Sequence, residues 1–378
     1  MAARGERETH VGSSFSSTVL ERFLLGFEGA CLPDELRVLL KQGLAGVAIF
    51  HRNFESLEGL CALTQEIQQA AGRPVLVGID QEGGTRYALK EPFTVWPTPT
   101  ELGLVDDSPL VERTAQAMAA ELAAVGCNLN FAPMLDLAMN PASPVTTDRS
   151  LGADPHKVAR LGAAFIRGLE SGGVLACAKH YPGHGDTQVD PHVDLPVFNG
   201  TLDRLNQVEL VPFAEAVAAG VPVIMTAHIL LPQIDPERPA SVSQKMLSGT
   251  LRRQMRFGGV ILADDLGMGA IARRYGPGDA AVETLLAGTD TAMLCHDWLA
   301  VRPALDAVER AFQQGRFSQA EWQSSHARIE RLRTRVAAAT REVPPLAVVG
   351  CAEHRALATK IRERAAKVKT SGTTDERR

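Results

Sequence analysis

Short apolar runs alternate with longer stretches of helical periodicity along most of this 378-residue chain. A polar cluster follows each run, and this alternation of strands and helices predicts a sheet of parallel strands. Eight such units predict a closed (β/α)8 barrel, because a doubly wound sheet, the second choice, usually has about five to seven strands. The runs are Phe23–Phe27, Gly46–Phe50, Val75–Ile79, Asn128–Phe131, Val174–Ala178, Val221–Met225, Gly259–Ala263 and Thr291–Cys295.

The length of the chain favours one large domain over several small ones. We expect residues 1–345 to form the barrel, with amphipathic helices such as Ser108–Val125, in which Ser108 is the N-cap and Pro109 the first helical residue. After Pro344 and Pro345 the sequence becomes charged and rich in alanine. Residues 346–378 are therefore predicted to form a tail that is helical at first and disordered over its last nine residues.

Charge and cysteine usage exclude several classes of protein. The formal net charge is -5, with 39 basic and 44 acidic residues, so no nucleic-acid partner is expected. The six cysteines are spaced singly, which is typical of free thiols in a reducing compartment. We find neither a signal peptide nor an apolar run of about 18 residues, and we expect a cytoplasmic protein without a membrane span.

Polar residues stand where the apolar runs end, and this position points to a site. In a barrel the carboxyl ends of the strands converge on one mouth. A single carboxylate there is equally well explained as the N-cap of the next helix, but five strand ends together favour an active site. Asp265 is the exception, because alternation along a strand predicts it on the opposite face from Asp264. The strand ends in question carry Asp80, Asp136, Lys179 with His180, His228, and Asp264 with Asp265.

The loop after the fifth strand is rich in histidine and aspartate, and a metal site is the rival interpretation. Two histidines four residues apart bind a metal when they share a helix, but Pro182, Gly183 and Gly185 make a helix unfavourable there. We therefore expect no metal and no cofactor. Proton transfer is the alternative, because Asp190 can orient His192 and stabilise its cation.

The same loop carries a family resemblance. Lys179-His180-Tyr181-Pro182-Gly183-His184-Gly185-Asp186-Thr187, followed by Asp190-x-His192, resembles the signature of the glycoside hydrolase family 3 β-N-acetylglucosaminidases. The likeness runs from about Phe27 to Cys295. Further matching segments are Gly78–Gly84, Asn130–Asp136, Asp148–Ser150, Met225–His228 and Gly258–Met268.

The resemblance implies a retaining glycosidase for a small carbohydrate that contains N-acetylglucosamine. Asp264 would be the nucleophile, and His192, paired with Asp190, would be the acid/base. By the same comparison Asp80, Arg149, Lys179 and His180 would bind the sugar. His184 would support the turn of the loop, with Asp136 and His228 behind the site.

Three features depart from the family pattern. Ala88 stands where the family often has an arginine, and Pro191 stands between Asp190 and His192 where serine is usual. Proline restricts its own φ and pushes Asp190 toward extended geometry, which predicts a stiffer or displaced loop. Cys351–Ala358 resembles the linker to a second domain of larger members, and we expect no such domain here.

Three functions are therefore compared. The first is hydrolysis of a terminal β-linked N-acetylglucosamine, from muropeptide fragments in cell-wall recycling or from chitin-type oligosaccharides. The second is phosphorolysis, because a histidine acid/base lacks the negative charge that would repel phosphate. The third is a sugar-binding relative without catalysis, which Ala88 and Pro191 suggest.

Overall fold

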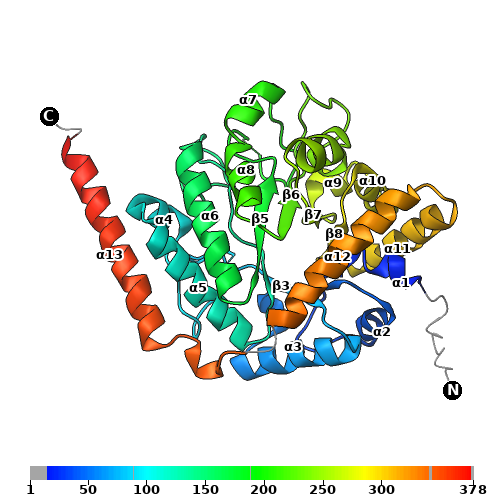
Figure 1. Ribbon diagram of the computed structural model, residues 1–378, viewed down its shortest axis with the longest axis horizontal. Coiled ribbons are helices and arrows are strands. Elements are labelled where there is room, and N and C mark those ends of the chain that lie inside the picture. Colours follow the sequence, from blue (N-terminus) through cyan, green and yellow to red (C-terminus); the bar gives the residue numbers. More distant parts are fainter. Residues whose placement is uncertain (1–14, 88, 188, 340–342, 376–378) are drawn as a thin grey trace, which may run out of the picture.

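The computed structural model describes residues 15–87, 89–187, 189–339 and 343–375. Eight parallel strands pair in chain order and close into a barrel, since the last strand pairs with the first (Figure 1). All eight predicted strands and the predicted (β/α)8 barrel are confirmed. The strands are β1 Phe23–Leu25, β2 Gly46–Ile49, β3 Leu76–Ile79, β4 Leu129–Asn130, β5 Leu175–Tyr181, β6 Val223–Thr226, β7 Val260–Asp265 and β8 Thr291–Leu294.

Helical segments surround the barrel and connect its strands. The predicted helix from Ser108 forms, but its N-cap is Asp107, whose carboxylate accepts a hydrogen bond from the Leu110 amide. The α-helices are α1 Ser17–Leu20, α2 Asp34–Gln42, α3 Leu57–Ala71, α4 Pro99–Val105, α5 Ser108–Ala124, α6 Pro155–Ser171, α7 Leu202–Gln207, α8 Val211–Ala218, α9 Gly269–Ala272, α10 Pro277–Ala287, α11 Trp298–Gln313, α12 Gln319–Ala339 and α13 Ala352–Asp375. The short segments η1 His51–Asn53, η2 Ala240–Val242 and η4 Leu346–Val348 are 3-10 helices, and η3 Lys245–Gln254 is a π-helix.

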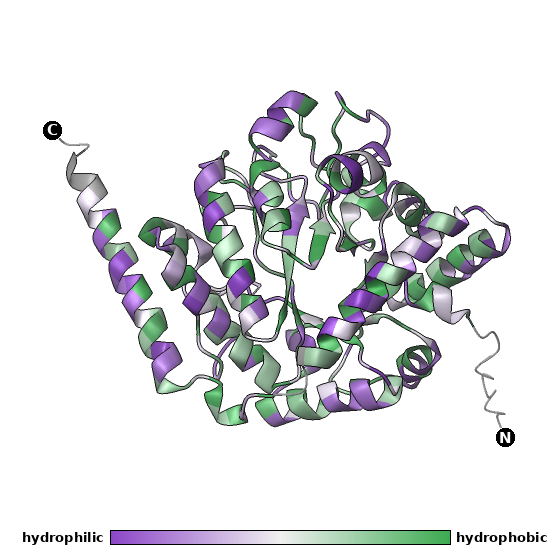
Figure 2. Cartoon of the chain, in the orientation of Figure 1, coloured by the Kyte–Doolittle hydropathy of each residue, from purple (hydrophilic) through white to green (hydrophobic). Residues whose placement is uncertain are grey.

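Two apolar cores stabilise the barrel. One lies between the strands and the outer helices, and the other fills the barrel interior. Figure 2 shows hydrophobic colour on the strands and mixed colour on the surrounding helices. Three residues of α12, Ile329, Leu332 and Val336, pack against the interior core. Since Ile329 and Leu332 line one small cavity with Leu76, the first residue of β3, α12 covers the amino end of the barrel and leaves the carboxyl end for a ligand.

One point at which the chain after residue 345 contacts the barrel is Glu121 of α5. This buried carboxylate accepts hydrogen bonds from the Gly350 amide, from the Thr94 hydroxyl and from Nδ1 of His354 on α13. Helix α13 continues through Asp375, so Thr370–Asp375 is helical where the sequence predicts disorder. Residues 376–378 lie outside the described residues. The expected domain boundary at residue 345 stays a prediction.

Among the described residues, no helix combines the length and apolar character needed to cross a membrane. All six cysteines are free thiols.

Candidate active site

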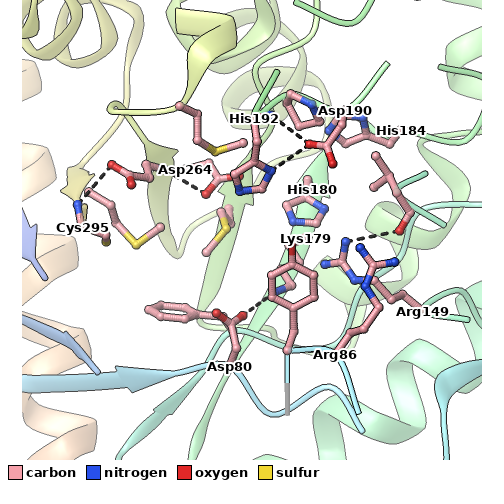
Figure 3. A pocket seen from close by; sticks show the side chains of 18 of the residues that line it. Asp80, Arg86, Arg149, Lys179, His180, His184, Asp190, His192, Asp264 and Cys295 are labelled. Carbon is pink, nitrogen blue, oxygen red and sulfur yellow. Dashed lines mark hydrogen bonds and ion pairs between the residues drawn. The ribbon is translucent and has the colours of Figure 1, made fainter. Parts of the chain in front are cut away.

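One pocket at the carboxyl end of the barrel contains every residue for which the sequence predicts a catalytic or sugar-binding role (Figure 3). Side chains from the strand ends and from the following loops form its walls. The predicted residues that line it are Asp80, Arg149, Lys179, His180, Asp190, His192 and Asp264. The strand ends therefore converge on one pocket, as the sequence predicts.

Two register shifts direct consecutive residues into this pocket. Between Ala178 and Tyr181 strand β5 has one residue more than its partner β6, and β7 has an extra residue at Asp264 relative to β8. An extra residue interrupts the alternation of a strand. Asp264 and Asp265 consequently both line the pocket, and the expectation that Asp265 lies on the opposite face is wrong.

A cluster of two cations and two carboxylates forms one wall. The Lys179 ammonium lies 2.6 Å from Asp80 and 2.6 Å from Glu82, and Arg149 makes two hydrogen bonds to Glu82 at 2.7 and 2.8 Å. Burial alone would raise the pKa of Glu82, but Lys179 and Arg149 outweigh it and lower that pKa to about 2. Glu82 is thus a buried, ionised support for both cations.

Tyr87 covers the same wall. Its ring centroid lies 4.2 Å from the Arg149 guanidinium carbon and 5.8 Å from the Lys179 ammonium. Arg86 also lines the pocket and lies 5.8 Å from the ring. Position 88, where the family arginine is replaced by alanine, lies outside the described residues.

His180 is held by a carboxylate that comes from the loop after β4. Nδ1 of His180 lies 2.7 Å from Asp136, and the same carboxylate accepts a 2.6 Å hydrogen bond from the His184 amide. Burial raises and the neighbouring histidines lower the pKa of Asp136, which falls to about 2. Asp136 therefore fixes both the imidazole and the start of the loop. His184 contacts Thr187 within that loop, and burial lowers its pKa to about 4.

The third histidine of the motif, His192, occupies an exposed loop. Nδ1 of His192 lies 2.8 Å from Asp190, and the His192 side chain is 55% exposed. Pro191, which stands between the two residues, does not prevent this contact. The Pro191 carbonyl accepts a hydrogen bond from the Ala270 amide of α9, which holds the loop against that helix. A Cβ atom at Gly269 would lie 2.6 Å from the His192 carbonyl oxygen, so this approach requires glycine.

Asp264 lines the same pocket, and its carboxylate is ionised. Burial raises its pKa, but His180 and His228 reverse the effect and leave the pKa below its usual value. The Asp265 amide donates a 2.8 Å hydrogen bond to Asp264. His228 itself is buried between Ser241 and the Asp265 carbonyl.

Two residues that line the pocket, Tyr87 and His296, and one that supports its wall, Glu82, were not predicted from the sequence. Glu82 stands two residues after Asp80, and His296 follows the apolar run of β8, so the rule used for the other strand ends would have found His296. Tyr87 gives no such signal, because it lies within an irregular loop.

The described residues contain one group of three side chains whose ligand atoms lie close enough to hold a metal: Glu21, His326 and Glu330. Glu21 precedes β1 and the other two belong to α12, so the group lies at the closed end of the barrel. Its carboxylates already pair with Arg22 and Arg333. In the pocket His180 and His192 are each paired with an aspartate, which favours proton transfer.

Comparisons with known proteins agree with this geometry. The sequence profile of the glycosyl hydrolase family 3 N-terminal domain matches residues 24–332. A β-hexosaminidase of Stenotrophomonas maltophilia strain K279a is 38% identical over 293 residues, which are 76% of this chain and 86% of the relative. A β-hexosaminidase of Thiobacillus denitrificans is 38% identical over 269 residues, 70% of this chain and 74% of its own.

Solved structures give the same result. The glycoside hydrolase family 3 β-N-acetylglucosaminidase of Paenibacillus sp. FPU-7 superposes with a TM-score of 0.88 at 36% identity, over 94% of this chain and 69% of that one. NagZ of Neisseria gonorrhoeae, in complex with N-trifluoroacetyl-D-glucosamine, has a TM-score of 0.75 at 28% identity and covers 91% and 98% of the two chains.

Proposed function

Because this chain belongs to glycoside hydrolase family 3, we propose that it removes terminal β-linked N-acetylglucosamine with retention, through a covalent intermediate on Asp264. Its activity is that of a β-N-acetylhexosaminidase, which matches its curated relatives. The observation that carries the detailed mechanism is one pocket that holds an ionised aspartate and an imidazole–carboxylate pair.

Asp264 is proposed to attack the anomeric carbon. A nucleophilic carboxylate must be ionised at neutral pH, and the low pKa of Asp264 meets this requirement. The backbone amide of Asp265 donates a hydrogen bond to Oδ1 of Asp264, which fixes the orientation of the Asp264 carboxylate.

His192 is proposed to act as acid and then as base. Its Nδ1 bonds Asp190, so Nε2 is the atom that protonates the leaving oxygen and later takes a proton from water. Asp190 stabilises the imidazolium that carries this proton. The exposed position of the pair lets it exchange protons with solvent.

The wall of Asp80, Lys179 and Arg149, together with His180, is proposed to bind the hydroxyl groups of the reacting sugar. The Lys179 ammonium keeps one N–H beyond its two carboxylate partners, and Asp80 is the more exposed of those carboxylates. Charge-assisted hydrogen bonds of this kind are stronger than neutral ones. Muropeptide fragments from cell-wall recycling and chitin-type oligosaccharides are the substrates proposed.

The first prediction tests the nucleophile. Asp264→Ala should lower kcat for an aryl β-N-acetylglucosaminide by more than about a thousandfold, because the covalent step is lost. Added azide should then produce the α-glycosyl azide, since the small anion attacks from the face that Asp264 vacates. Product configuration is read by NMR.

Asp279→Ala, which removes an exposed carboxylate of α10, serves as the matched control and should retain activity. An Asp264→Ala enzyme with wild-type rates would refute the mechanism. A wild-type enzyme that releases the sugar 1-phosphate in phosphate buffer would replace hydrolysis by phosphorolysis. Binding of N-acetylglucosamine without any turnover would leave only a sugar-binding protein.

A further inference from the structure

A third aspartate–histidine pair stands at the rim of the pocket, and the proposed mechanism does not use it. His296 follows β8, and its Nδ1 lies 2.6 Å from the Asp265 carboxylate. The other oxygen of Asp265 accepts hydrogen bonds from the Gly267 and Cys295 amides. The imidazole is thus held in place, although its side chain is 53% exposed.

His296 is also the exposed end of a row of neighbouring side chains, in which the His296 and Phe50 rings are tilted by 51°. The Phe50 ring centroid lies 5.0 Å from that of His296, and the Arg52 guanidinium carbon lies 4.3 Å from the Phe50 centroid. Arg52 is itself fixed by an ion pair with Glu28 and by a hydrogen bond to the Cys295 carbonyl. The row therefore presents a rigid surface to the pocket.

The two halves of the pocket differ in chemistry. Among the charged groups, Asp80 directly follows β3, Lys179 belongs to β5 and Arg149 to the loop after β4, whereas Phe50 and His296 follow β2 and β8. Charged groups bind sugar hydroxyls, whereas aromatic rings pack against the C–H faces of a pyranose. A sugar substrate contains both kinds of surface.

Two linked sugar units of a substrate would occupy the pocket at different depths. On the His296 side, Met293 and Cys295 are each 4% exposed and form the floor beside Asp264, whereas His296 lies at the rim. The unit that reacts with Asp264 has to reach the floor. The unit attached through the scissile oxygen then extends outward, where His296 is exposed.

We propose that His296, supported by Asp265 and Phe50, forms the leaving-group subsite and that this subsite takes a pyranose ring. The ring packs on the imidazole, and Nε2, on the side of the imidazole away from Asp265, bonds a hydroxyl of the sugar. This inference rests on the proposed function, because it assumes that Asp264 reacts with the preceding sugar unit.

The test compares two substrates that share the reacting sugar. N,N′-diacetylchitobiose has a pyranose leaving group, and β-N-acetylglucosaminyl fluoride has a single atom there. His296→Ala should lower kcat/KM for the disaccharide about tenfold, the value of one aromatic contact, and the value for the fluoride by less than about threefold. His296→Phe keeps a ring and should recover most of the disaccharide rate.

His51→Ala is the matched control, because His51 is another exposed histidine beside Phe50 whose ring contacts Phe54 and does not line the pocket. It should leave both rates at wild-type values. Equal losses of His296→Ala on the two substrates, or no loss on the disaccharide, would overturn the subsite. A wild-type enzyme that cleaves neither substrate would overturn the proposed function as well.

Discussion

Two aspartate–histidine pairs of the same composition face one pocket from opposite surroundings. Asp136 and His180 are buried, and the aspartate also holds the His184 amide. Asp190 and His192 lie on a loop, and their side chains are 33% and 55% exposed. The buried pair has fixed partners and a fixed position, whereas the loop pair has access to water. For these two pairs, we propose that burial, more than residue type, separates the sugar-binding role of His180 from the proton-transfer role of His192.

The largest effect is expected from the loop pair. His192→Ala should lower the rate for an alkyl β-N-acetylglucosaminide by roughly 10²–10⁴-fold, because a poor leaving group needs a proton. A dinitrophenyl glycoside, whose leaving group is already acidic, should lose much less. The ratio of the two rates is the measurement. Asp194→Ala on the same loop is the control, and equal losses on both substrates would remove His192 from the role of acid.

The buried pair should affect stability first. Asp136→Asn should lower the free energy of unfolding by about 3 kcal/mol, because charged hydrogen bonds to buried groups are weakened. The pKa of Asp136 is lowered in the folded protein, so its contribution is complete above the unfolded value and declines as the pH falls from about 4 toward 2.

Urea unfolding at pH 7 and at pH 3 measures this difference, which should be smaller at the lower pH. Asp190→Asn is the comparison variant and should unfold like the wild type at both pH values, because the Asp190 carboxylate is partly exposed. A stability loss confined to Asp190→Asn would reverse the assignment of the two pairs.

The smallest effect is expected from the loop carboxylate alone. Asp190→Asn should lower kcat/KM about tenfold, because an anion close to an imidazolium contributes on the order of 1.4 kcal/mol. The measurement is kcat/KM of the variant and the wild type for an alkyl β-N-acetylglucosaminide. A variant as fast as the wild type would remove Asp190 from the proposed acid/base pair.

The sequence predicts the barrel well because each strand leaves a local signal. Every apolar run from Phe23 to Cys295 became a strand, and polar residues at the strand ends met in one pocket. Period-two alternation failed at Asp265, because the extra residue in β7 is a property of pairing with β8 and no local pattern records it.

Contacts between segments that are distant in the sequence could not be predicted either. Glu82 looks like one more acidic residue in a glycine-rich loop until the fold brings Lys179 to it from β5 and Arg149 from the loop after β4. The packing of α13 is a similar case, because this helix lies on α4 and is held by Asp107 and Glu121.

The contact between Gly269 and the loop limits how this site can change over evolution. Gly269 lies just beyond β7, which carries Asp264, and the His192 and Val193 carbonyls occupy the space that a side chain would need. An insertion in either segment would separate the two reacting groups unless the other segment changed with it. The proposed nucleophile and the proposed acid should therefore be inherited as one block, and exchanging the loop alone between relatives should give chimeras that fold but do not react.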